Sequence, residues 1–355
     1  MSLWSHMREV FSSAHANDGD AVGGAPSEPR VPLAAVREAI DSGLLSVAQQ
    51  PRNNALDLSD SMLERLYVFL IDHDYPGGSA AMHNAVFDAY GLPFRSCFMI
   101  GDPGRVDDIF ALLRHDPVYA GGGAGSGFKD KIAPSLDRLA PSAKTIGSVN
   151  VIAREGRAFV GHNTDGVGFV AGLMGEYPNC VAGRKVVILG AGGTALPIAY
   201  ELAKCGPKEI VISNRTVAKA TQIAQLIAPL ANARAVGEDV IGDELAEADL
   251  VVNTSNKGAQ PNEKFSAFAP MTGDVAGDMA VSLANIAKLP RSAIVADILL
   301  EEMPLTLKLA ADRGIRIHSG RHMNLYQAVP AFKIITGQDK PDDEILSLMR
   351  AALRK

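Results

Sequence analysis

Apolar runs and amphipathic segments alternate along most of the chain. In the first half, runs suited to buried strands cover residues 63–71, 94–100, 148–155 and 157–165. Segments with helical spacing cover residues 79–92 and 103–116. The last two of these strands predict a hairpin that turns over Glu155 and Gly156. Alternation of this kind favours an α/β sheet.

The second half repeats the alternation more regularly. Residues 167–177 form a helical segment that links the two halves. Predicted strands then cover residues 185–190, 209–214, 248–255, 292–299 and 315–320. Predicted helices cover residues 194–206, 216–231 and 304–314, and the tail is helical over residues 322–337 and 343–355. This order is typical of a parallel sheet with crossover helices, so both halves are expected to be α/β.

Two segments break the pattern. Residues 14–30, AHANDGDAVGGAPSEPR, are small, polar and rich in Gly, Ala and Pro, which favours a flexible segment. A short helix is predicted over residues 32–45, and ordered structure is otherwise expected to begin at residue 63. The glycine-rich run from Gly121 to Gly127 is predicted to be a mobile loop that orders when a ligand binds.

Composition narrows the class of protein. The 355 residues are enough for two domains, and 47% hydrophobic with 21% charged residues is typical of a soluble globular protein. The net charge of −6, without a basic stripe, argues against nucleic-acid binding. We find no transmembrane run and no signal-peptide pattern, which favours a cytoplasmic protein without a membrane partner.

The cysteines and histidines predict neither disulfides nor a metal site. Cys97, Cys180 and Cys205 are odd in number and lack metal-like spacing, so we expect buried thiols in a reducing compartment. Among the eight histidines we identify no ligand-spaced pair with suitable partners, and no metal is expected.

A dinucleotide-binding fingerprint, G-x-G-x-x-A, follows the strand at residues 185–190 and opens the next helix. Its residues are Gly190, Ala191, Gly192, Gly193, Thr194 and Ala195. The first glycine permits a tight turn, the second lets the backbone approach a pyrophosphate, and the alanine keeps the helix close to the sheet. The helix N-terminus then presents N–H groups to the phosphates. The alternative is a purely structural strand–turn–helix.

The next strand indicates which dinucleotide binds. NAD sites usually place Asp or Glu there to bond the ribose 2′-hydroxyl. This chain instead has Asn214, Arg215, Thr216 and Lys219. The guanidinium of Arg215 can pair with a 2′-phosphate, and Lys219 adds a second positive charge. These residues favour NADP over NAD, the alternative being a solvated basic turn.

Lys129 and Asp165 are the candidate proton-transfer residues. Lys129 lies in GSGFKDKIAP and Asp165 in GHNTDGVGF. Hydride removal from an alcohol carbon also requires the hydroxyl proton to leave, and a lysine with a lowered pKa can accept it. A nearby carboxylate would orient the lysine and also raise its pKa, and the sequence does not decide which effect dominates. Taken singly, a surface lysine and a turn-forming aspartate are the alternatives.

From about Leu66 to the C-terminus the chain resembles the shikimate dehydrogenase family, which includes quinate/shikimate dehydrogenases. The motifs that carry the resemblance occur in the family's order: His83 and Asn84, Lys129, Asn150 in IGSVNVI, Asp165 in GHNTDGVGF, the GAGGTA turn, the triplet Asn214–Thr216, and Gln327 in NLYQAV. The resemblance implies a substrate domain at 56–165, a Rossmann NADP-binding domain at 166–320, and C-terminal helices at 321–355 that pack back on the first domain. Residues 1–55 would be a partly flexible arm, and the active site would lie in the cleft between the domains.

The resemblance also implies roles for single residues. Lys129 and Asp165 would be the catalytic pair, and Asn150 and Gln327 would hold substrate hydroxyls. Ser79 and Ser126 are further candidates for substrate binding, and Met323 would lie near the nicotinamide. The implied reaction interconverts a ring secondary alcohol and a ketone with NADP. The expected substrate is 3-dehydroshikimate/shikimate or a relative such as quinate or an aminated analogue.

The chain departs from the family where the substrate carboxylate is expected. Gly77 replaces the first serine of a Ser-x-Ser pair, and Gly123–Gly125 replaces Asn-Val-Thr. Leu300 stands where a tyrosine is expected, and His322-Met323-Asn324 replaces Gly-Met-Leu. Each missing hydrogen bond to a buried carboxylate costs about 1–3 kcal/mol. Arg321, His322 or Ser126 are candidates to replace the lost donors.

Two other interpretations of the protein's function stay open. One is a divergent paralogue that acts on another hydroxy compound. The other is a non-catalytic NADP-binding regulatory protein, against which the presence of Lys129 and Asp165 argues. The expected partner is a small hydroxy acid, and the protein is expected to be a monomer or a homodimer.

Overall fold

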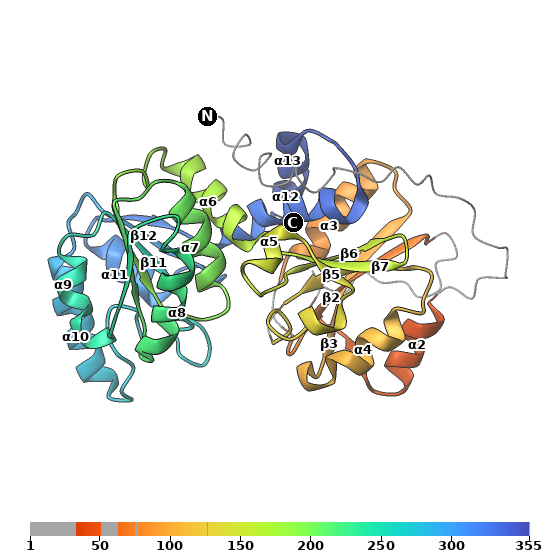
Figure 1. Cartoon of the computed structure of the whole chain (residues 1–355), viewed down its shortest axis with the longest axis horizontal. Coiled ribbons are helices and arrows are strands. Elements are labelled where there is room, and N and C mark those ends of the chain that lie inside the picture. The colour runs from red at the N-terminus through yellow and green to blue at the C-terminus, as the bar shows by residue number, and fades with distance from the viewer. Residues whose placement is uncertain (1–32, 51–62, 75–76, 126, 355) are drawn as a thin grey trace. The chain divides into compact units, whose positions relative to one another are not determined.

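The structure is a computed structural model that describes residues 33–50, 63–74, 77–125 and 127–354. Within these ranges the chain forms two compact units. The first comprises residues up to Thr164 together with those from Ala328 onward, and the second is Asp165–Gln327. The sequence placed the corresponding boundaries after residues 165 and 320. Figure 1 shows that each unit is a sheet flanked by helices, so the predicted α/β class is confirmed.

The first unit is built on a mixed seven-stranded sheet in the order β1-β3-β2-β4-β6-β7-β5. Its strands are β1 (Leu45–Val47), β2 (Arg65–Ile71), β3 (Phe94–Gly101), β4 (Tyr119–Ala124), β5 (Arg138–Leu139), β6 (Val151–Glu155) and β7 (Ala158–His162). Strand β2 pairs in parallel with both β3 and β4, whereas β6 and β7 form the predicted antiparallel hairpin. Because β2 is central, its Leu66, Val68 and Leu70 are fully buried.

Helices cover this sheet and close its core. They are α2 (Ala34–Asp41), α3 (Ser79–Ala89), α4 (Val106–Leu113), α5 (Pro141–Lys144) and α13 (Asp342–Ala352), with short 3-10 turns at Pro103–Arg105 and Ala133–Ser135. Helix α12 (Gly320–Thr336) contains the second division point, and its last turns join this unit. The Tyr67 hydroxyl donates to the Ile335 carbonyl at 2.9 Å, and α13 packs on α3 (Figure 1). The last turns of α12 and helix α13 are therefore part of this unit's core.

The glycine run that the sequence placed in a mobile loop is largely a buried strand. Residues Gly121–Ala124 belong to β4, between β2 and β6. A Cβ at Gly122 would lie 2.1 Å from the Val68 carbonyl oxygen, and one at Gly121 would lie 2.1 Å from that of Ile152. Neighbouring backbones thus approach too closely for a side chain. The prediction failed because glycine normally weakens strands, and only the packing reveals this exception.

Ordered structure also begins earlier than predicted. The expected short helix is confirmed as α2, and β1 follows it. Strand β1 pairs antiparallel with β3, with Leu45 opposite Gly101, so it forms one edge of the sheet. Three residues were too few to register as a strand in the sequence pattern. The predicted flexible segment at residues 14–30 lies outside the described residues.

The second unit contains a parallel six-stranded sheet in the order β10-β9-β8-β11-β12-β13. Its strands are β8 (Lys185–Leu189), β9 (Glu209–Ser213), β10 (Ala233–Val236), β11 (Leu250–Asn253), β12 (Ile294–Asp297) and β13 (Arg316–His318). Its helices are α6 (Asp165–Glu176), α7 (Ala195–Lys204), α8 (Val217–Ile227), α9 (Ile241–Leu245), α10 (Val275–Lys288) and α11 (Leu305–Asp312), with a 3-10 turn at Glu238–Val240. This strand order is that of a doubly wound dinucleotide-binding domain.

Both faces of the parallel sheet are buried, which explains its unbroken apolar strands. In β8, Val186 and Ile188 belong to one core cluster, whereas Val187 and Leu189 belong to another. Successive side chains of a strand point to opposite faces, so each face must be covered by helices. The sequence predicted five of the six strands, and the short, half-buried β10 was missed.

Helix α6 packs through glycines against the backbones of two other helices of its unit. A Cβ at Gly166 would lie 2.1 Å from the Pro197 carbonyl oxygen of α7. A Cβ at Gly168 would lie 2.5 Å from the backbone nitrogen of Gln327 in α12. Gly172, one turn later on the same side as Gly168, approaches the Cβ of His322 less closely, at 3.3 Å. The glycines of the DGVGFVAG segment therefore permit this close packing.

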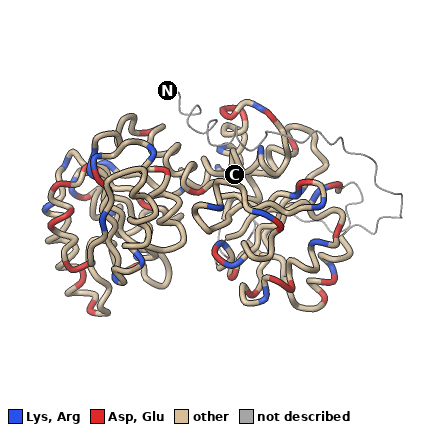
Figure 2. The backbone as a smooth tube through the Cα atoms, in the orientation of Figure 1, with Lys and Arg blue, Asp and Glu red and all other residues tan. Residues whose placement is uncertain are grey.

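Charged residues of both signs are interspersed along the described backbone of both units (Figure 2). No helix in the part of the chain that the structure describes is long and apolar enough to cross a membrane.

We expect Gly168→Ala to lower the free energy of unfolding by about 1–3 kcal/mol, because the new methyl group overlaps the backbone of α12. Gly172→Ala is the matched control on the same helix. Its added methyl group makes only a tight contact, and alanine gains about 1 kcal/mol of helix propensity. Denaturant unfolding of both variants checks this. Equal stability losses would show that the α6–α12 approach does not depend on Gly168.

Candidate active site

The fingerprint forms the predicted strand–turn–helix between β8 and α7. Gly190 has φ of +111°, which favours glycine, and its Cβ would lie 3.0 Å from the Ser255 backbone nitrogen. A Cβ at Gly192 would meet only the Thr254 carbonyl oxygen, at 3.9 Å, so open space lies above this residue. Gly193 is exposed, Thr194 precedes α7, and Ala195 is fully buried at its start. This geometry suits a pyrophosphate placed against the N-terminus of α7.

Asn214 connects the fingerprint turn to the loop after β9. Its Oδ1 accepts a hydrogen bond from the Ala191 N–H at 3.2 Å, and its Nδ2 donates to the Thr216 carbonyl at 2.9 Å. Arg215, Thr216 and Lys219 follow, and all three are exposed. The basic side chains thus begin directly beside the turn, where a ribose 2′-phosphate would lie if a dinucleotide occupied the usual crevice.

A buried polar network joins the carboxyl ends of β11 and β12. Asn253 donates from Nδ2 to Asp297 at 2.9 Å, and its Oδ1 accepts from the backbone N–H and the hydroxyl of Ser255. Asp297 also accepts from the Leu299 N–H at 2.9 Å. Burial raises the pKa of Asp297 to about 7. Sequence reasoning assigned no role to this pair, because isolated polar residues at strand ends carry no spacing signal.

Lys129 lies in the turn that follows β4. It is half-buried, and its carbonyl accepts a hydrogen bond from the Val149 N–H at 3.0 Å. This bond fixes the lysine backbone next to the segment that contains Asn150. Ser126, three residues earlier, lies outside the described residues.

Asn150 clamps the residue that precedes Asp165. The Asn150 side chain donates to the Thr164 hydroxyl at 3.0 Å and accepts from the Thr164 N–H at 2.8 Å. Asp165 follows as the first residue of α6, where the helix dipole favours a carboxylate, and it is only 3% exposed. The described contacts of Asn150 thus support a positioning role for its amide.

The His-Asn pair of α3 is structural in this arrangement. The Asn84 side chain makes two hydrogen bonds with the backbone of Ser96 in β3, at 2.9 and 2.8 Å. His83 bonds to the Ser79 carbonyl at 2.7 Å and packs against Phe69. Burial lowers the pKa of His83 to about 4, so its ring is neutral at pH 7. Ser79, at the start of α3, is half-buried.

Helix α12 carries three of the remaining candidates. Met323 is buried, and Gln327 donates from Nε2 to the Asn324 carbonyl at 3.1 Å. Arg321 is exposed and donates from Nε to the Leu300 carbonyl at 3.0 Å. The described contacts of Arg321 therefore direct it to the loop after β12.

Comparison with known proteins shows which family the chain belongs to. Family models described as shikimate / quinate 5-dehydrogenase and as shikimate dehydrogenase substrate binding domain match residues 175–264 and 77–152. The shikimate dehydrogenase (NADP(+)) of Desulforamulus reducens is 30% identical over 299 residues, which cover 82% of this chain and 95% of the relative. The chain belongs to the shikimate dehydrogenase family.

Solved structures give the same result. The shikimate dehydrogenase of Aquifex aeolicus is 26% identical with a TM-score of 0.68, and the match covers 83% of this chain and 99% of that one. The ligand-free 5-ketofructose reductase of a Gluconobacter strain is also 26% identical, with a TM-score of 0.62 and coverage of 81% and 98%. The resemblance inferred from the motifs is confirmed.

One departure from the shikimate dehydrogenase pattern has a structural explanation. A Cβ at Gly123, where the family has asparagine, would lie 2.3 Å from Cδ1 of Phe69. The Phe69 ring stacks on the Phe98 ring with 5.2 Å between the ring centroids, and its centroid lies 5.3 Å from that of the His83 ring. An aromatic ring therefore occupies the space next to Gly123 that a polar side chain would need.

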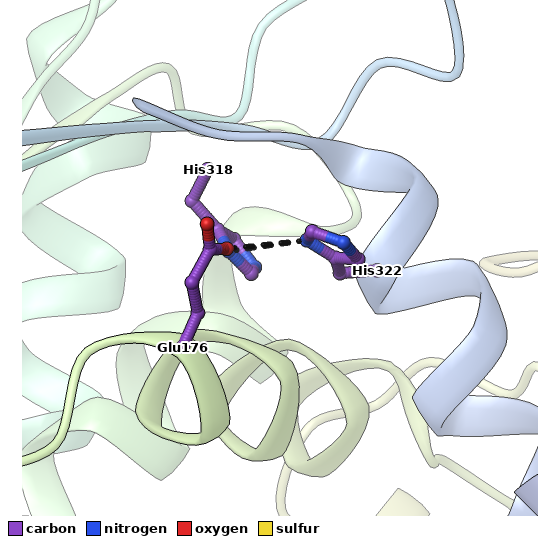
Figure 3. Close-up of side chains that lie close together, drawn as sticks. All are labelled: Glu176, His318 and His322. Atoms are coloured by element: carbon purple, nitrogen blue, oxygen red, sulfur yellow. Dashed lines mark hydrogen bonds and ion pairs between the residues drawn. The ribbon is translucent and has the colours of Figure 1, made fainter. Parts of the chain in front are cut away.

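The prediction that no ligand-spaced pair of histidines has suitable partners overlooked one pair. His318 and His322 are four residues apart, and the structure brings both to Glu176 (Figure 3). The segment HSGRH contained this signal. Its two histidines lie on different elements, the end of β13 and the first turn of α12, so a search along a single helix misses them. Glu176, far away in the sequence, could not have been assigned. His322 therefore faces this cluster in the described structure.

Asp297 should make stability depend on pH. Its folded-state pKa of about 7 lies above the ordinary value of about 4, so the folded state binds the proton more tightly. The contribution of Asp297 to the free energy of unfolding therefore falls as pH rises from about 4 to about 7, by up to about 1.4 kcal/mol per pH unit.

Asp297→Asn removes the titration, although its amide changes the contact with Asn253. Denaturant unfolding of both proteins across this pH range measures the difference. We expect the wild type to lose stability relative to the variant as pH rises. A difference that stays constant would mean that the Asp297 carboxyl does not titrate in this range.

Proposed function

We propose that the protein is an NADP-dependent dehydrogenase that interconverts a ring secondary alcohol and a ketone in a polyhydroxy acid. The leading substrate is 3-dehydroshikimate/shikimate or a close relative such as quinate or aminoshikimate. The observation that carries the proposal is the presence of Lys129, Asn150, Asp165 and Gln327 in a member of the shikimate dehydrogenase family. The name of the Desulforamulus relative supports both the reaction and the cofactor.

The residues around the fingerprint fit NADP. Open space above Gly192 and the N-terminus of α7 suit the pyrophosphate. Arg215 and Lys219 are exposed beside the turn, and the segment from Asn214 to Lys219 contains no carboxylate that would repel a 2′-phosphate. NADP, when bound, supplies the hydride acceptor or donor. Arg215 would hold the 2′-phosphate through two parallel hydrogen bonds.

Lys129 and Asp165 would carry out the transfer of the substrate hydroxyl proton. In the oxidative direction the substrate hydroxyl gives its proton to the lysine amine as hydride leaves the carbon. In the reductive direction the ammonium returns a proton to the new alkoxide. Asp165, nearly buried at the start of α6, would orient the lysine and accept a hydrogen bond from the substrate. The Asn150–Thr164 bonds support this role because they constrain the backbone that leads into Asp165.

A different hydroxy substrate is the second candidate. Phe69 fills the space beside Gly123, and Gly77 has no hydroxyl, so the region offers fewer donors to a substrate carboxylate. The likeness to a 5-ketofructose reductase supports this candidate, because that protein's named substrate is a sugar without a carboxylate. On this reading the substrate keeps the ring alcohol and lacks the carboxylate.

The first test follows NADPH formation from NADP with shikimate, with quinate and fructose-type polyols in parallel. We expect turnover by the wild type and a kcat about 10²–10⁴-fold lower for Lys129→Ala, because general acid–base catalysis is lost. Lys131→Ala, an exposed lysine in the same turn region, is the matched control and should retain full activity.

Turnover with polyols and none with the acids would favour the second candidate. NADP binding without turnover on any alcohol would contradict both, and it would support the non-catalytic reading. Equal activity of wild type and Lys129→Ala would contradict the assigned base.

Arg321→Ala tests the proposed replacement donor in the same assay. An unchanged KM for shikimate would show that Arg321 does not bind the substrate.

Arg215→Ala should raise the KM for NADP about 10–100-fold, since hydrogen bonds to a charged group contribute about 1.5–3 kcal/mol. The KM for NAD should stay unchanged, because NAD has no 2′-phosphate. Lys208→Ala, exposed just before the other end of β9, controls for the loss of surface charge. Parallel loss of both cofactors in Arg215→Ala would show that the arginine supports the loop and does not select NADP.

A further inference from the structure

Three side chains of the second unit converge on one point (Figure 3). Glu176 ends α6, His318 ends β13, and His322 lies in the first turn of α12. Oε2 of Glu176 lies 2.8 Å from Nδ1 of His318 and 3.4 Å from Nδ1 of His322. The two Nδ1 atoms are 3.4 Å apart. One carboxylate oxygen and two imidazole nitrogens thus form a triangle with two equal sides and one shorter side.

We propose that this triangle binds a first-row transition-metal ion, with zinc as the leading candidate. A point equidistant from three corners with these separations lies at least about 1.9 Å from each. Zinc binds imidazole nitrogen at about 2.0–2.1 Å and carboxylate oxygen at about 2.0–2.2 Å. An ion slightly out of the plane of the three atoms therefore satisfies all three distances, as at one face of a tetrahedron.

Hydrogen bonds alone cannot satisfy all three of these polar atoms. If both Nδ1 atoms carry protons and donate to Glu176, two N–H groups confront each other at 3.4 Å. If only one carries a proton, the other nitrogen turns its lone pair toward the carboxylate. A cation removes this conflict because it accepts both nitrogen lone pairs and neutralises the carboxylate charge.

The donor set indicates the class of metal. Two imidazoles and one carboxylate suit zinc, copper, nickel and cobalt, whereas magnesium and calcium favour sites made of oxygen atoms. The His318 side chain is fully buried, and those of His322 and Glu176 are 45% and 39% exposed. Solvent can therefore reach one side of the ion, which leaves a fourth position for water.

The surrounding structure holds the three side chains in place, but one ring nitrogen of His318 has no hydrogen-bond partner within the described structure. The Tyr177 hydroxyl donates to the Ile317 carbonyl at 2.8 Å, which fastens the end of α6 to β13. The His318 ring lies edge-to-face with Phe169, and its Nε2 has no hydrogen-bond partner within the described structure. A missing partner behind a ligand costs about 10–100-fold in affinity, so we expect zinc to bind less tightly here than at a site in which every ligand has such a partner.

The test uses the full-length protein without a histidine tag. Zinc binding is measured by competition with a chromophoric chelator, and Co²⁺ is added separately because four-coordinate cobalt gives intense visible absorption. We expect one ion per chain, the cobalt spectrum of a four-coordinate site, and no binding of Mg²⁺ or Ca²⁺ under the same conditions. Zinc should also raise the Tm, because it stabilises only the folded chain.

Three variants, His318→Gln, His322→Gln and Glu176→Gln, should each weaken zinc binding at least tenfold and abolish the cobalt spectrum. His115→Gln, an exposed histidine outside the cluster, should bind as the wild type does. His322 and Glu176 are partly exposed, so their variants keep the test decisive if His318→Gln fails to fold. Binding that survives both of these substitutions, or an absence of any binding at micromolar zinc, would overturn the proposal.

Discussion

The close approach of α6 to its neighbours is the constraint on which the rest of the second unit depends. Gly166 lets α6 contact the backbone of α7, which carries the fingerprint turn at its N-terminus. Gly168 lets it contact α12 at Gln327. The same helix begins with Asp165 and ends with Glu176. Helix α6 therefore sets the distances between a candidate catalytic carboxylate, the nucleotide turn and the histidine cluster. A larger residue at Gly166 or Gly168 would shift the helix and so change all of these positions.

The two units reach their buried sheets by different routes. In the second unit, apolar side chains cover both faces of parallel strands, and polar groups collect where the strands end, as with Asn253 and Asp297. The first unit instead uses glycine within its sheet, because the carbonyl groups of β2 and β6 approach β4 too closely for side chains at Gly121 and Gly122. Side chains are thereby excluded from the middle of β4, and the surface beside it is formed by Phe69 and its aromatic neighbours.

Much of this architecture could be predicted from the sequence, because long apolar runs and helical spacing are local properties. Strands β8, β9, β11, β12 and β13 and the turn at Gly190 followed from such patterns. The failures involve requirements that neighbours impose. Strand β4 has a composition typical of a loop, and its need for glycine comes from Val68 and Ile152. The Asn253–Asp297 bond joins residues far apart in the chain, and so does the contact of Glu176 with the two histidines, so no spacing rule connects these partners.

The pairing of Phe69 with Gly123 also constrains how this pocket can change. Asparagine at position 123 beside an intact Phe69 would overlap the ring, whereas a small residue at position 69 beside Gly123 would leave a cavity. Each substitution alone is therefore expected to cost stability, whereas the two together are expected to cost less than the sum of their separate effects. The two positions are therefore energetically coupled, so a pocket with a polar side chain at position 123 requires a compensating change at Phe69.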